Sequence, residues 1–253
     1  MVLNKKKPYV SLLLLCAFFI GISAQRAGAA ANPSSLEYEG ASVIWKVWDT
    51  RVWRFPLASA VDVEVMSDNF NRLHANGFKL SDLKVDKKEG KWALCIKDQV
   101  LLTALPEHSG NIPLNTHIIA LQWMSKIYDA VGDTYARALT PEYKLKGGYN
   151  ISASVSWYGD KRFFGKKCAN GERFTESLLS AAAKNLPFGT LVRITTPKNG
   201  RSVVVRITDR FREHKNRALD ISHAAAEILG IKSVGVANVN VQVIGRVDAI
   251  GGK

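Results

Sequence analysis

The chain has 253 residues, of which 47% are hydrophobic and 23% are charged. This composition excludes a disordered or collagen-like protein and suffices for one or two globular domains. A formal net charge of +13 excludes an acidic surface, and a total of three cysteines excludes a small disulfide-rich scaffold.

The N-terminus has the features of a secretory signal peptide. Lys5 to Lys7 are positively charged, Val10 to Ile22 is an apolar run, and Ala27-Gly28-Ala29 offers small residues to a signal peptidase. The run is shorter than the roughly 20 residues of a membrane-spanning helix, and Cys16 lies inside it, which disfavours a lipid anchor. We therefore expect a signal peptide over residues 1–29, a periplasmic or cell-wall-associated protein, and no transmembrane segment in the mature chain.

The excess positive charge lies in the C-terminal part of the chain. Residues 30–147 contain 14 basic and 14 acidic residues, whereas residues 148–253 contain 17 basic and 8 acidic ones. Such a field attracts polyanions, although it also serves solubility alone. Since an exported protein is not expected to bind nucleic acid, a cell-wall polymer or anionic lipid headgroups are the better candidates.

A break in composition predicts two domains. Thr140-Pro141, the charged Lys144 to Lys146 and the flexible pair Gly147-Gly148 are typical of a linker. We expect this linker over residues 140–148, an N-terminal domain over residues 30–139 and a C-terminal domain over residues 149–253.

The N-terminal domain has the pattern of a mixed α+β fold without an evident reaction centre. The aromatic-rich Val43 to Phe55 predicts a strand, and Lys91 to Leu105 a strand or hairpin. Two helices are expected. The first helix follows Ala58-Ser59 and ends at Gly77, and its apolar face is formed by Met66, Phe70 and Leu73. The second helix is capped by Asn115 and ends before Gly132. Its apolar face is formed by Ala120, Met124, Ile127 and Val131.

The C-terminal domain has the pattern of a small β-barrel or sandwich. Val203 to Ile207 and Val239 to Val243 alternate with period two, as strands do. One short helix is expected over His223 to Leu229, with Ser222 as its N-cap and Gly230 at its end.

Several blocks in this domain occur in the order and spacing of a known family. They are Ser156-Trp157-Tyr158-Gly159, Phe164-Gly165, Ala169-Asn170-Gly171-Glu172, Leu186-Pro187-Phe188-Gly189-Thr190, Asp209-Arg210, Arg217 to Ser222, Ala224 to Ala226 and Leu229-Gly230. Over residues 148–246 the chain resembles the rare lipoprotein A family of lytic transglycosylases. The resemblance implies a mainly-β, six-stranded double-psi β-barrel like that of the expansins. We therefore expect an α+β N-terminal domain, which lies outside the resemblance, followed by this barrel.

The resemblance also implies a chemistry and a substrate. Family members cleave the β-1,4 bond between N-acetylmuramic acid and N-acetylglucosamine in peptidoglycan glycan strands, and form a 1,6-anhydro ring instead of consuming water. Asp209 and Glu172 match the two functional carboxylates of the family. We expect Asp209 to be the general acid/base and Glu172 to stabilise charge or to orient the sugar. Without the resemblance, both are better explained as turn residues.

Six further residues are expected to bind substrate: Trp157, Tyr158, Asn170, Arg210, Arg217 and Asp220. For some of them a structural role competes. Arg217 and Asp220 pair with each other in that alternative, and the two aromatic side chains fill the barrel core instead of stacking on sugar rings.

The chain departs from the family pattern at three places. Ala183 replaces a histidine beside the site, Phe211-Arg212-Glu213 replaces Gly-Pro-Phe, and the chain ends at Lys253 without the glycan-binding repeat domain that many members carry. These departures keep a second hypothesis open, in which the barrel is a non-catalytic, expansin-like module that binds or loosens the cell wall.

Metal and thiol chemistry find little support in the sequence. His74, His108, His117, His214 and His223 lack the spacing of metal ligands, so we expect neither a metal nor a cofactor. Cys95 and Cys168, which follow the signal peptide, either form a disulfide between the two domains or are separate thiols.

Overall fold

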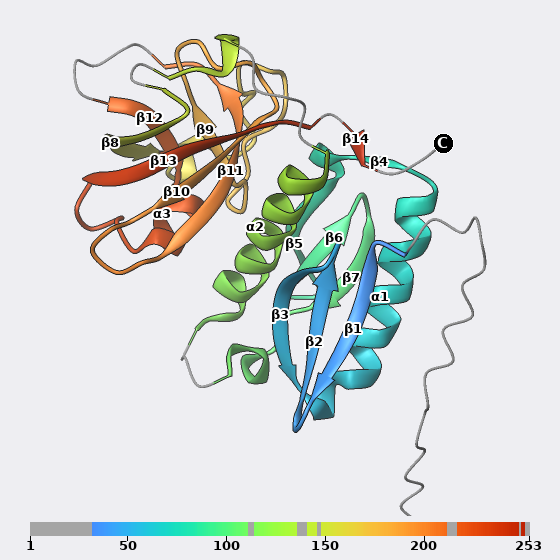
Figure 1. Ribbon diagram of the computed structural model, residues 1–253. Helices are drawn as coiled ribbons and strands as arrows, with labels where there is room; N and C mark the ends of the chain where they lie inside the picture. Colours follow the sequence, from blue (N-terminus) through green and yellow to red (C-terminus); the bar gives the residue numbers. More distant parts are fainter. Residues whose placement is uncertain are drawn as a thin grey trace, which may run out of the picture. The chain divides into compact units, whose positions relative to one another are not determined.

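The computed structural model describes residues 32–110, 114–135, 141–145, 148–211, 217–247 and 249–250 (Figure 1). The predicted signal peptide lies outside these residues, as do residues 140, 146 and 147 of the predicted linker, so both stay predictions. Asn32–Lys253 form one compact unit, and the domain boundaries proposed above within it also remain a prediction. Within the described ranges, no helix is both long and apolar enough to span a bilayer.

The chain begins with an antiparallel sheet of β1 (Ser34–Glu39), β2 (Ser42–Val47) and β3 (Thr50–Pro56). The interpretation of Val43 to Phe55 as one strand is wrong, because the chain reverses at Trp48 and Asp49. Both residues have positive φ, 46° and 66°, as a tight two-residue hairpin turn requires. Neither is the glycine or asparagine that normally signals such a turn, which is why the sequence conceals it.

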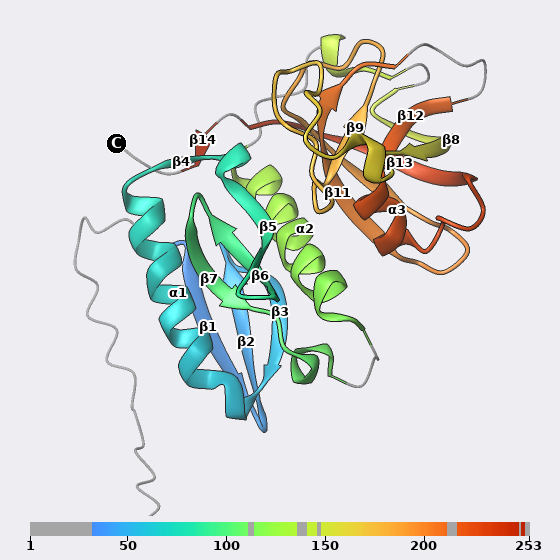
Figure 2. The same ribbon diagram turned by 180° about the vertical axis from the view of Figure 1, so that it is seen from behind.

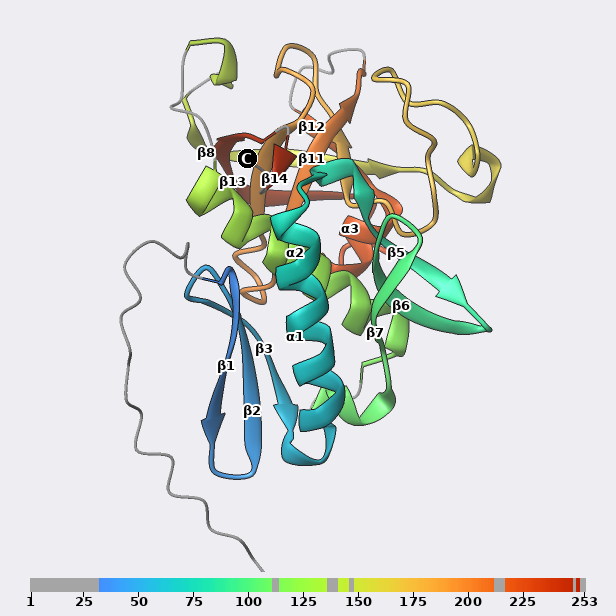
Figure 3. The same cartoon turned by 90° about the vertical axis from the view of Figure 1, so that its right-hand side faces the viewer.

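One face of this sheet packs on α1 (Ala60–Ala75), which follows the short helix η1 (Leu57–Ser59) and lies along the sheet in Figure 3. Met66 and Phe70 are fully buried, and Phe70 meets Trp45 edge-on at 6.0 Å between ring centroids. The predicted first helix is thus confirmed, and Gly77 beyond its end has a φ of 68°.

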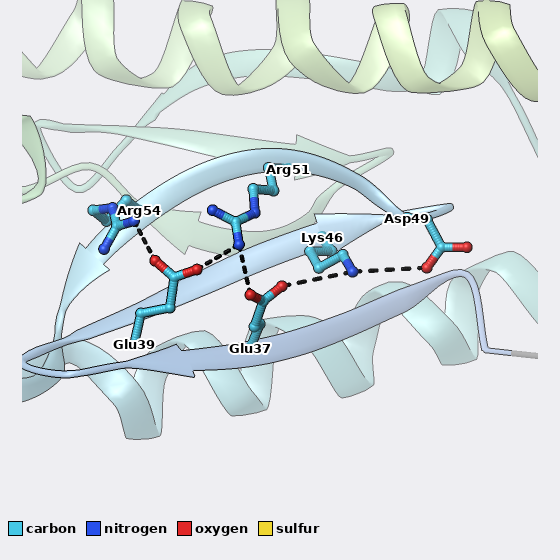
Figure 4. A network of polar contacts seen from close by, with 6 residues as sticks. All are labelled: Glu37, Glu39, Lys46, Asp49, Arg51 and Arg54. Atoms are coloured by element: carbon cyan, nitrogen blue, oxygen red, sulfur yellow. Dashed lines mark hydrogen bonds and ion pairs between the residues drawn. The ribbon is translucent and has the colours of Figure 1, made fainter.

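The opposite face of the sheet carries a network of exposed charges (Figure 4). Arg51 lies between Glu37 and Glu39, Arg54 binds the second oxygen of Glu39, and Lys46 approaches Glu37 at 3.7 Å. Exposed ion pairs of this kind contribute little each, about 0–1 kcal/mol. The network therefore keeps this face soluble more than it holds the sheet together.

A second antiparallel sheet follows, made of β5 (Leu83–Lys88), β6 (Lys91–Ile96) and β7 (Gln99–Thr103). Its last two strands are the hairpin expected over Lys91 to Leu105. Short elements flank it: β4 (Phe78–Lys79), η2 (Leu80–Asp82) and η3 (Pro106–Ser109).

The long helix α2 (Thr116–Tyr135) contacts β6 on one side and the C-terminal strand β11 (Ser202–Asp209) on the other, as Figures 1 and 2 show. Its N-cap is Asn115, as predicted, because the side-chain Oδ1 accepts the Ile118 N–H at 2.9 Å. The expectation that Gly132 ends the helix is wrong. Gly132 lies inside α2, where a Cβ atom would come within 2.6 Å of Ile244 Cγ2. This glycine serves a close helix–strand approach.

The rest of the chain forms a closed six-stranded barrel in the order β10-β11-β9-β12-β8-β13. The strands besides β11 are β8 (Asn150–Tyr158), β9 (Ser180–Ala182), β10 (Thr190–Thr195), β12 (Arg217–Ser222) and β13 (Val236–Arg246). Two pairs, β11 with β9 and β12 with β8, are parallel, and the others are antiparallel. This mixed, closed sheet confirms the predicted barrel fold.

Short elements complete the chain. The predicted short helix is α3 (His223–Leu229), whose N-cap Ser222 accepts the Ala225 N–H and whose C-cap Gly230 is left-handed. The others are η4 (Pro141–Tyr143), η5 (Lys161–Phe163) and β14 (Ala249–Ile250), which pairs with β4.

Strand β11 is buried on both faces. Val203, Val205 and Ile207 alternate with Val204 and Arg206, as the period-two pattern predicts, yet all five are buried. The strand β9 pairs with β11 only from Arg206 onward, and α2 covers the preceding edge. There the Ser125 hydroxyl accepts the Val204 N–H at 2.9 Å, which satisfies a strand-edge donor.

The close packing at Gly132 predicts that Gly132→Ala lowers stability. Alanine favours a helix interior by about 1 kcal/mol, but the added methyl group meets the β-branched, stiff Ile244, and overpacking costs about 1–3 kcal/mol. Urea unfolding should show a net loss. In an Ile244→Ala background the clash is gone, so the same substitution should become neutral or stabilising; an equal loss in both backgrounds would contradict this account.

Candidate active site

Four residues on adjacent barrel strands form a row at one end of the barrel. Asp209, the last residue of β11, pairs with Ala182 of β9, which pairs with Asp220 of β12, which in turn pairs with Ser156 of β8. With strands 4.7–4.9 Å apart, the Cα atoms of the two aspartates are about 10 Å apart. Ala182, which lies between them, contributes only a methyl group and is buried.

Main-chain donors fix the carboxyl group of Asp209. Its Oδ1 accepts the N–H groups of Ala169 at 3.0 Å and Arg210 at 2.8 Å. Its carbonyl oxygen accepts the Ala183 N–H at 3.1 Å. Among the described residues, no hydrogen bond to the second carboxyl oxygen, Oδ2, is present. One oxygen is thus held and the other is available for proton transfer.

The Glu172 carboxylate is held by a buried cation. Arg206 Nη1 and Nη2 donate to its two oxygens at 2.5 and 2.6 Å, a bidentate pair. Asn170 adds a third bond, from Nδ2 to Oε1 at 2.8 Å. The loop that carries both residues is tied to the end of β11 by the bond from Asn170 N–H to the Thr208 carbonyl oxygen. Both candidate carboxylates therefore depend on the same strand end.

The environment of Glu172 keeps it ionised. Burial alone would raise its pKa, but the hydrogen bonds and charge of Arg206, together with Asn170, outweigh burial and hold the pKa below its ordinary value of 4.5. The guanidinium is itself 5% exposed, and the pKa of Arg206 is raised because the bonds to Glu172 outweigh burial. At neutral pH this carboxylate has no proton to give.

Asp220 and Arg217 are linked through a third residue. The Ser156 hydroxyl donates to Asp220 Oδ1 at 2.7 Å and accepts from Arg217 Nη1 at 2.5 Å. Both residues thus have a structural partner in Ser156. The two expectations for them, binding substrate and holding the strand end, stay predictions.

The two aromatic residues of β8 have different surroundings. Tyr158 is next to the Ser156 end of the row, and burial raises the pKa of its hydroxyl, which lies 3.4 Å from the Ser180 hydroxyl. Trp157 donates from Nε1 to the Lys232 carbonyl at 3.1 Å and meets His223 edge-on. Its contacts are with α3 and the loop after it, so the structure does not bring Trp157 to the other candidate residues.

Arg210 lies beside the position of the replaced histidine. Its guanidinium carbon is 3.8 Å from the centre of the Phe188 ring, and Nη1 donates to the Ala183 carbonyl at 3.3 Å. Ala183 itself is buried. Arg212 and Glu213 lie outside the described residues.

A cavity of about 180 Å³ opens beside the Glu172–Arg206 pair. Asn170, Phe188 and Arg246 line it, together with Ser81 from the N-terminal part of the chain. A larger cavity of about 720 Å³, lined by residues such as Trp53 and His108, contains none of the predicted site residues. The larger of these two cavities is therefore not the one that contains the predicted site residues.

The sequence did not point to Arg206 or Ser156. Arg206 reads as an outward, solvent-facing residue of an alternating strand, although a lone charge within the apolar run Val203 to Ile207 is a signal that a buried partner exists. Ser156 lies in the resemblance blocks but has an uninformative side chain.

The described residues offer no metal centre, because no three potential ligands among them gather. Cys95 and Cys168 are both free and buried, which is the second of the two alternatives raised above. Burial raises the pKa of both thiols, so neither is an activated nucleophile.

Comparison with known proteins adds the family. The family model described as "Lytic transglycolase" matches residues 150–241, which span β8 to most of β13. Residues 150–241 of the barrel are thus similar to the lytic transglycolase domain family. Asp209, Glu172 and Asn170 lie within the matched residues.

Curated relatives agree with this domain assignment. The endolytic peptidoglycan transglycosylase RlpA of Rickettsia typhi is 40% identical over 138 residues, 54% of this chain and 41% of that protein. RlpA of Neisseria meningitidis serogroup A is 39% identical over 120 residues, 47% of this chain and 48% of that protein. The probable RlpA of Synechocystis is 46% identical over 101 residues, 40% of this chain and 30% of that protein. The chain thus spans less than half the length of each of these relatives.

Among solved structures, an expansin variant of Clavibacter michiganensis in complex with cellohexaose aligns with 37% of this chain and 50% of its own, at 17% identity and a TM-score of 0.32.

The buried ion pair predicts a pH-dependent stability. A carboxyl with a lowered pKa stabilises the fold above its unfolded value, and the contribution is lost as pH falls through the folded pKa, here below 4.5. Glu172→Gln should cost about 1–3 kcal/mol at pH 7, less than a fully buried pair, since the Glu172 side chain is 30% exposed. Thermal unfolding of both proteins should differ at pH 7 and converge once the pH falls below the lowered pKa of Glu172; a constant difference would contradict the pairing.

Proposed function

We propose that the protein is an exported, endolytic lytic transglycosylase that cleaves the β-1,4 bond between N-acetylmuramic acid and N-acetylglucosamine in peptidoglycan. The observation that carries the proposal is the Asp209 carboxyl group, held on one oxygen by the N–H groups of Ala169 and Arg210 inside a lytic transglycolase barrel. The names of the relatives supply the substrate class.

The two carboxylates take different roles in this proposal. Glu172 is locked to Arg206 and ionised, so it cannot protonate a leaving group. Asp209 has an available oxygen and is the general acid/base. The Glu172 anion stabilises the positive charge that develops on the sugar ring or orients the sugar.

In the reaction, Asp209 first donates a proton and then accepts one. Asp209 first gives its proton to the glycosidic oxygen while the bond between that oxygen and C1 of the muramic acid breaks. The C6 hydroxyl of the same sugar then attacks C1, and its proton passes to Asp209, which restores the acid. The products are a free 4-hydroxyl group and a 1,6-anhydro ring, and water is not consumed.

Five of the six predicted substrate-binding residues are proposed to contact the glycan around this centre. Tyr158, Asn170, Arg210, Arg217 and Asp220 offer aromatic and hydrogen-bonding contacts to a glycan on the row's side of the barrel. The 17 basic against 8 acidic residues of positions 148–253 favour approach to an anionic wall. A signal peptide over residues 1–29 would deliver the protein there.

A second candidate function is favoured by Ala183. This residue is 1% exposed and is bonded through its N–H to the Asp209 carbonyl, so its side chain places a methyl group, not an imidazole, beside the site. In this alternative the barrel binds glycan strands without cleaving them.

Digestion of purified peptidoglycan separates the two candidates. Incubation with residues 30–253 should release 1,6-anhydro-muropeptides detectable by mass spectrometry. Asp209→Asn should reduce the release at least about 100-fold, because general acid/base catalysis contributes roughly 10²–10⁴-fold.

Asp98→Asn serves as the matched control, since its side chain is 96% exposed in the N-terminal part, and it should retain full activity. Wild-type protein that binds peptidoglycan in a pull-down yet releases no anhydro product would overturn the enzymatic proposal and support the binding module.

A further inference from the structure

The outer face of the barrel carries a patch of uncharged, hydrogen-bonding side chains. Strands β8 and β13 pair side by side (Figure 1), and this pairing continues through β10 to β11. The outward positions of these strands are half-buried or exposed, whereas the alternating Val239 and Val241 of β13 are buried. We call six of the outward residues the amide–hydroxyl face: Ser152, Ser154, Thr195, Ser202, Asn238 and Asn240.

Hydrogen bonds within this face order its side chains but leave its amide groups unused. The Ser154 hydroxyl donates to Asn238 Oδ1 at 2.6 Å, and the Ser152 hydroxyl donates to Asn240 Oδ1 at 3.0 Å. An asparagine amide also carries two N–H donors on Nδ2. Within the described ranges, no hydrogen bond from Nδ2 of either asparagine is present. Both groups are therefore free to donate to a ligand, and side chains that are already ordered lose little entropy on binding.

The composition of the face is unusual for an exposed sheet. Asparagine is depleted in strands, yet β13 places Asn238 and Asn240 at successive outward positions. None of the six side chains is charged, although residues 148–253 contain 25 charged residues, 17 basic and 8 acidic. Solubility and strand formation are thus served poorly by these residue types. A surface of amides and hydroxyls suits a ligand that is itself rich in hydroxyl and amide groups.

The face continues the row of the candidate active site. Ser156, the last member of that row, lies two residues from Ser154 on the same side of β8, and its hydroxyl donates to Asp220 Oδ1 at 2.7 Å. From Asp209 to Ser156 the row crosses three strand spacings, about 14 Å. From Ser156 to Ser152 the distance along β8 is about 13 Å. A polymer bound at Asp209 reaches the face only when it extends several sugars beyond the reacting bond.

We propose that the amide–hydroxyl face binds the peptidoglycan glycan strand beyond the bond that is cleaved. The Nδ2 groups of Asn238 and Asn240 donate to the acetyl carbonyl and hydroxyl oxygens of successive sugars, and the serine and threonine hydroxyls accept from sugar hydroxyls. The inference rests on the proposed function and adds to it a preference for long strands.

Glycan binding without turnover is the first test. Residues 30–253 carrying Asp209→Asn keep the ligand intact, and glycan strands stripped of stem peptides are the probe. Adding Asn238→Ala and Asn240→Ala should weaken Kd about tenfold, because two hydrogen bonds of modest net strength are lost. Adding Asn69→Ala and Gln99→Ala instead removes two half-buried amides of the N-terminal part, and Kd should not change. Absence of binding by the parent protein, or equal Kd values for all three proteins, would overturn the proposal.

Chain-length dependence separates binding at the face from an effect on the reaction centre. In the protein with Asp209 intact, Asn238→Ala with Asn240→Ala should raise KM about tenfold on long strands, with kcat within twofold of wild type. A tetrasaccharide cleaved at its central bond extends only two sugars from Asp209, so its KM and kcat should stay unchanged. A fall in kcat on both substrates would place the two amides at the reaction centre and contradict a distant binding face.

The side-chain amide signals of Asn238 and Asn240 in ¹⁵N NMR report on the face directly. They should shift on titration with stripped strands, at protein concentrations where the free spectrum is constant. If wild type releases no anhydro product, the proposed function fails, and these signals alone decide the binding face. Signals that stay fixed overturn it. So do signals that respond only to protein concentration, which indicate a second copy of the chain, or only to free stem peptide.

Discussion

The guanidinium group of Arg206 is the charge around which this barrel end is arranged. A cation with 5% exposure is tolerated only when hydrogen-bonded anions and hydroxyls replace the water that it has lost. Glu172 provides two such acceptors, and the loop carrying Glu172 is therefore held against the end of β11. The same loop supplies the Ala169 N–H that orients Asp209, so one buried pair positions both candidate carboxylates.

The burial of Arg206 also explains why α2 belongs with the barrel. Since β9 has only three residues, the first half of β11 would otherwise be an edge with unpaired donors and an exposed valine face. Helix α2 covers that edge with an apolar face and places polar side chains at two points, Ser125 on a backbone donor and Asp129 on Arg193. Gly132 then lets the helix end approach Ile244 of β13. A single register of α2 against the barrel therefore satisfies both the apolar packing and the hydrogen bonds.

The sequence predicts most elements of this fold because their patterns are local. Period-two valines identify β11 and β13, and Asn115, Ser222 and Gly230 mark helix ends through bonds that their own side chains or backbones make. The failures arise where long-range packing decides. Trp48 and Asp49 form a hairpin turn without a glycine or an asparagine, and Gly132 serves a contact with a strand more than a hundred residues away.

The candidate site shows the same division. Asp209, Glu172 and Asn170 are found from the sequence only through the resemblance, since each is an ordinary turn residue by itself. Arg206 is not identified from the sequence, because alternation along a strand gives the two faces but not what covers them. Trp157, expected either at the glycan or in the barrel core, contacts His223 and Lys232, since strand period places it on the face opposite to Ser156. The residues that hold the carboxylates come from segments that no local pattern connects.

Alanine at position 183 affects proton transfer at the site more than it affects the orientation of Asp209. A histidine beside an aspartate can orient it or share its proton, and a methyl group does neither. Here the orientation of Asp209 comes from the main chain of Ala169 and Arg210, and the Ala183 N–H bonds the Asp209 carbonyl irrespective of the side chain at 183. An acid held by backbone donors keeps its geometry when a neighbouring side chain is lost. The loss of the imidazole therefore removes a second proton carrier. A single carboxyl group suffices for this reaction, because the attacking C6 hydroxyl returns the proton that the carboxyl gives to the leaving oxygen.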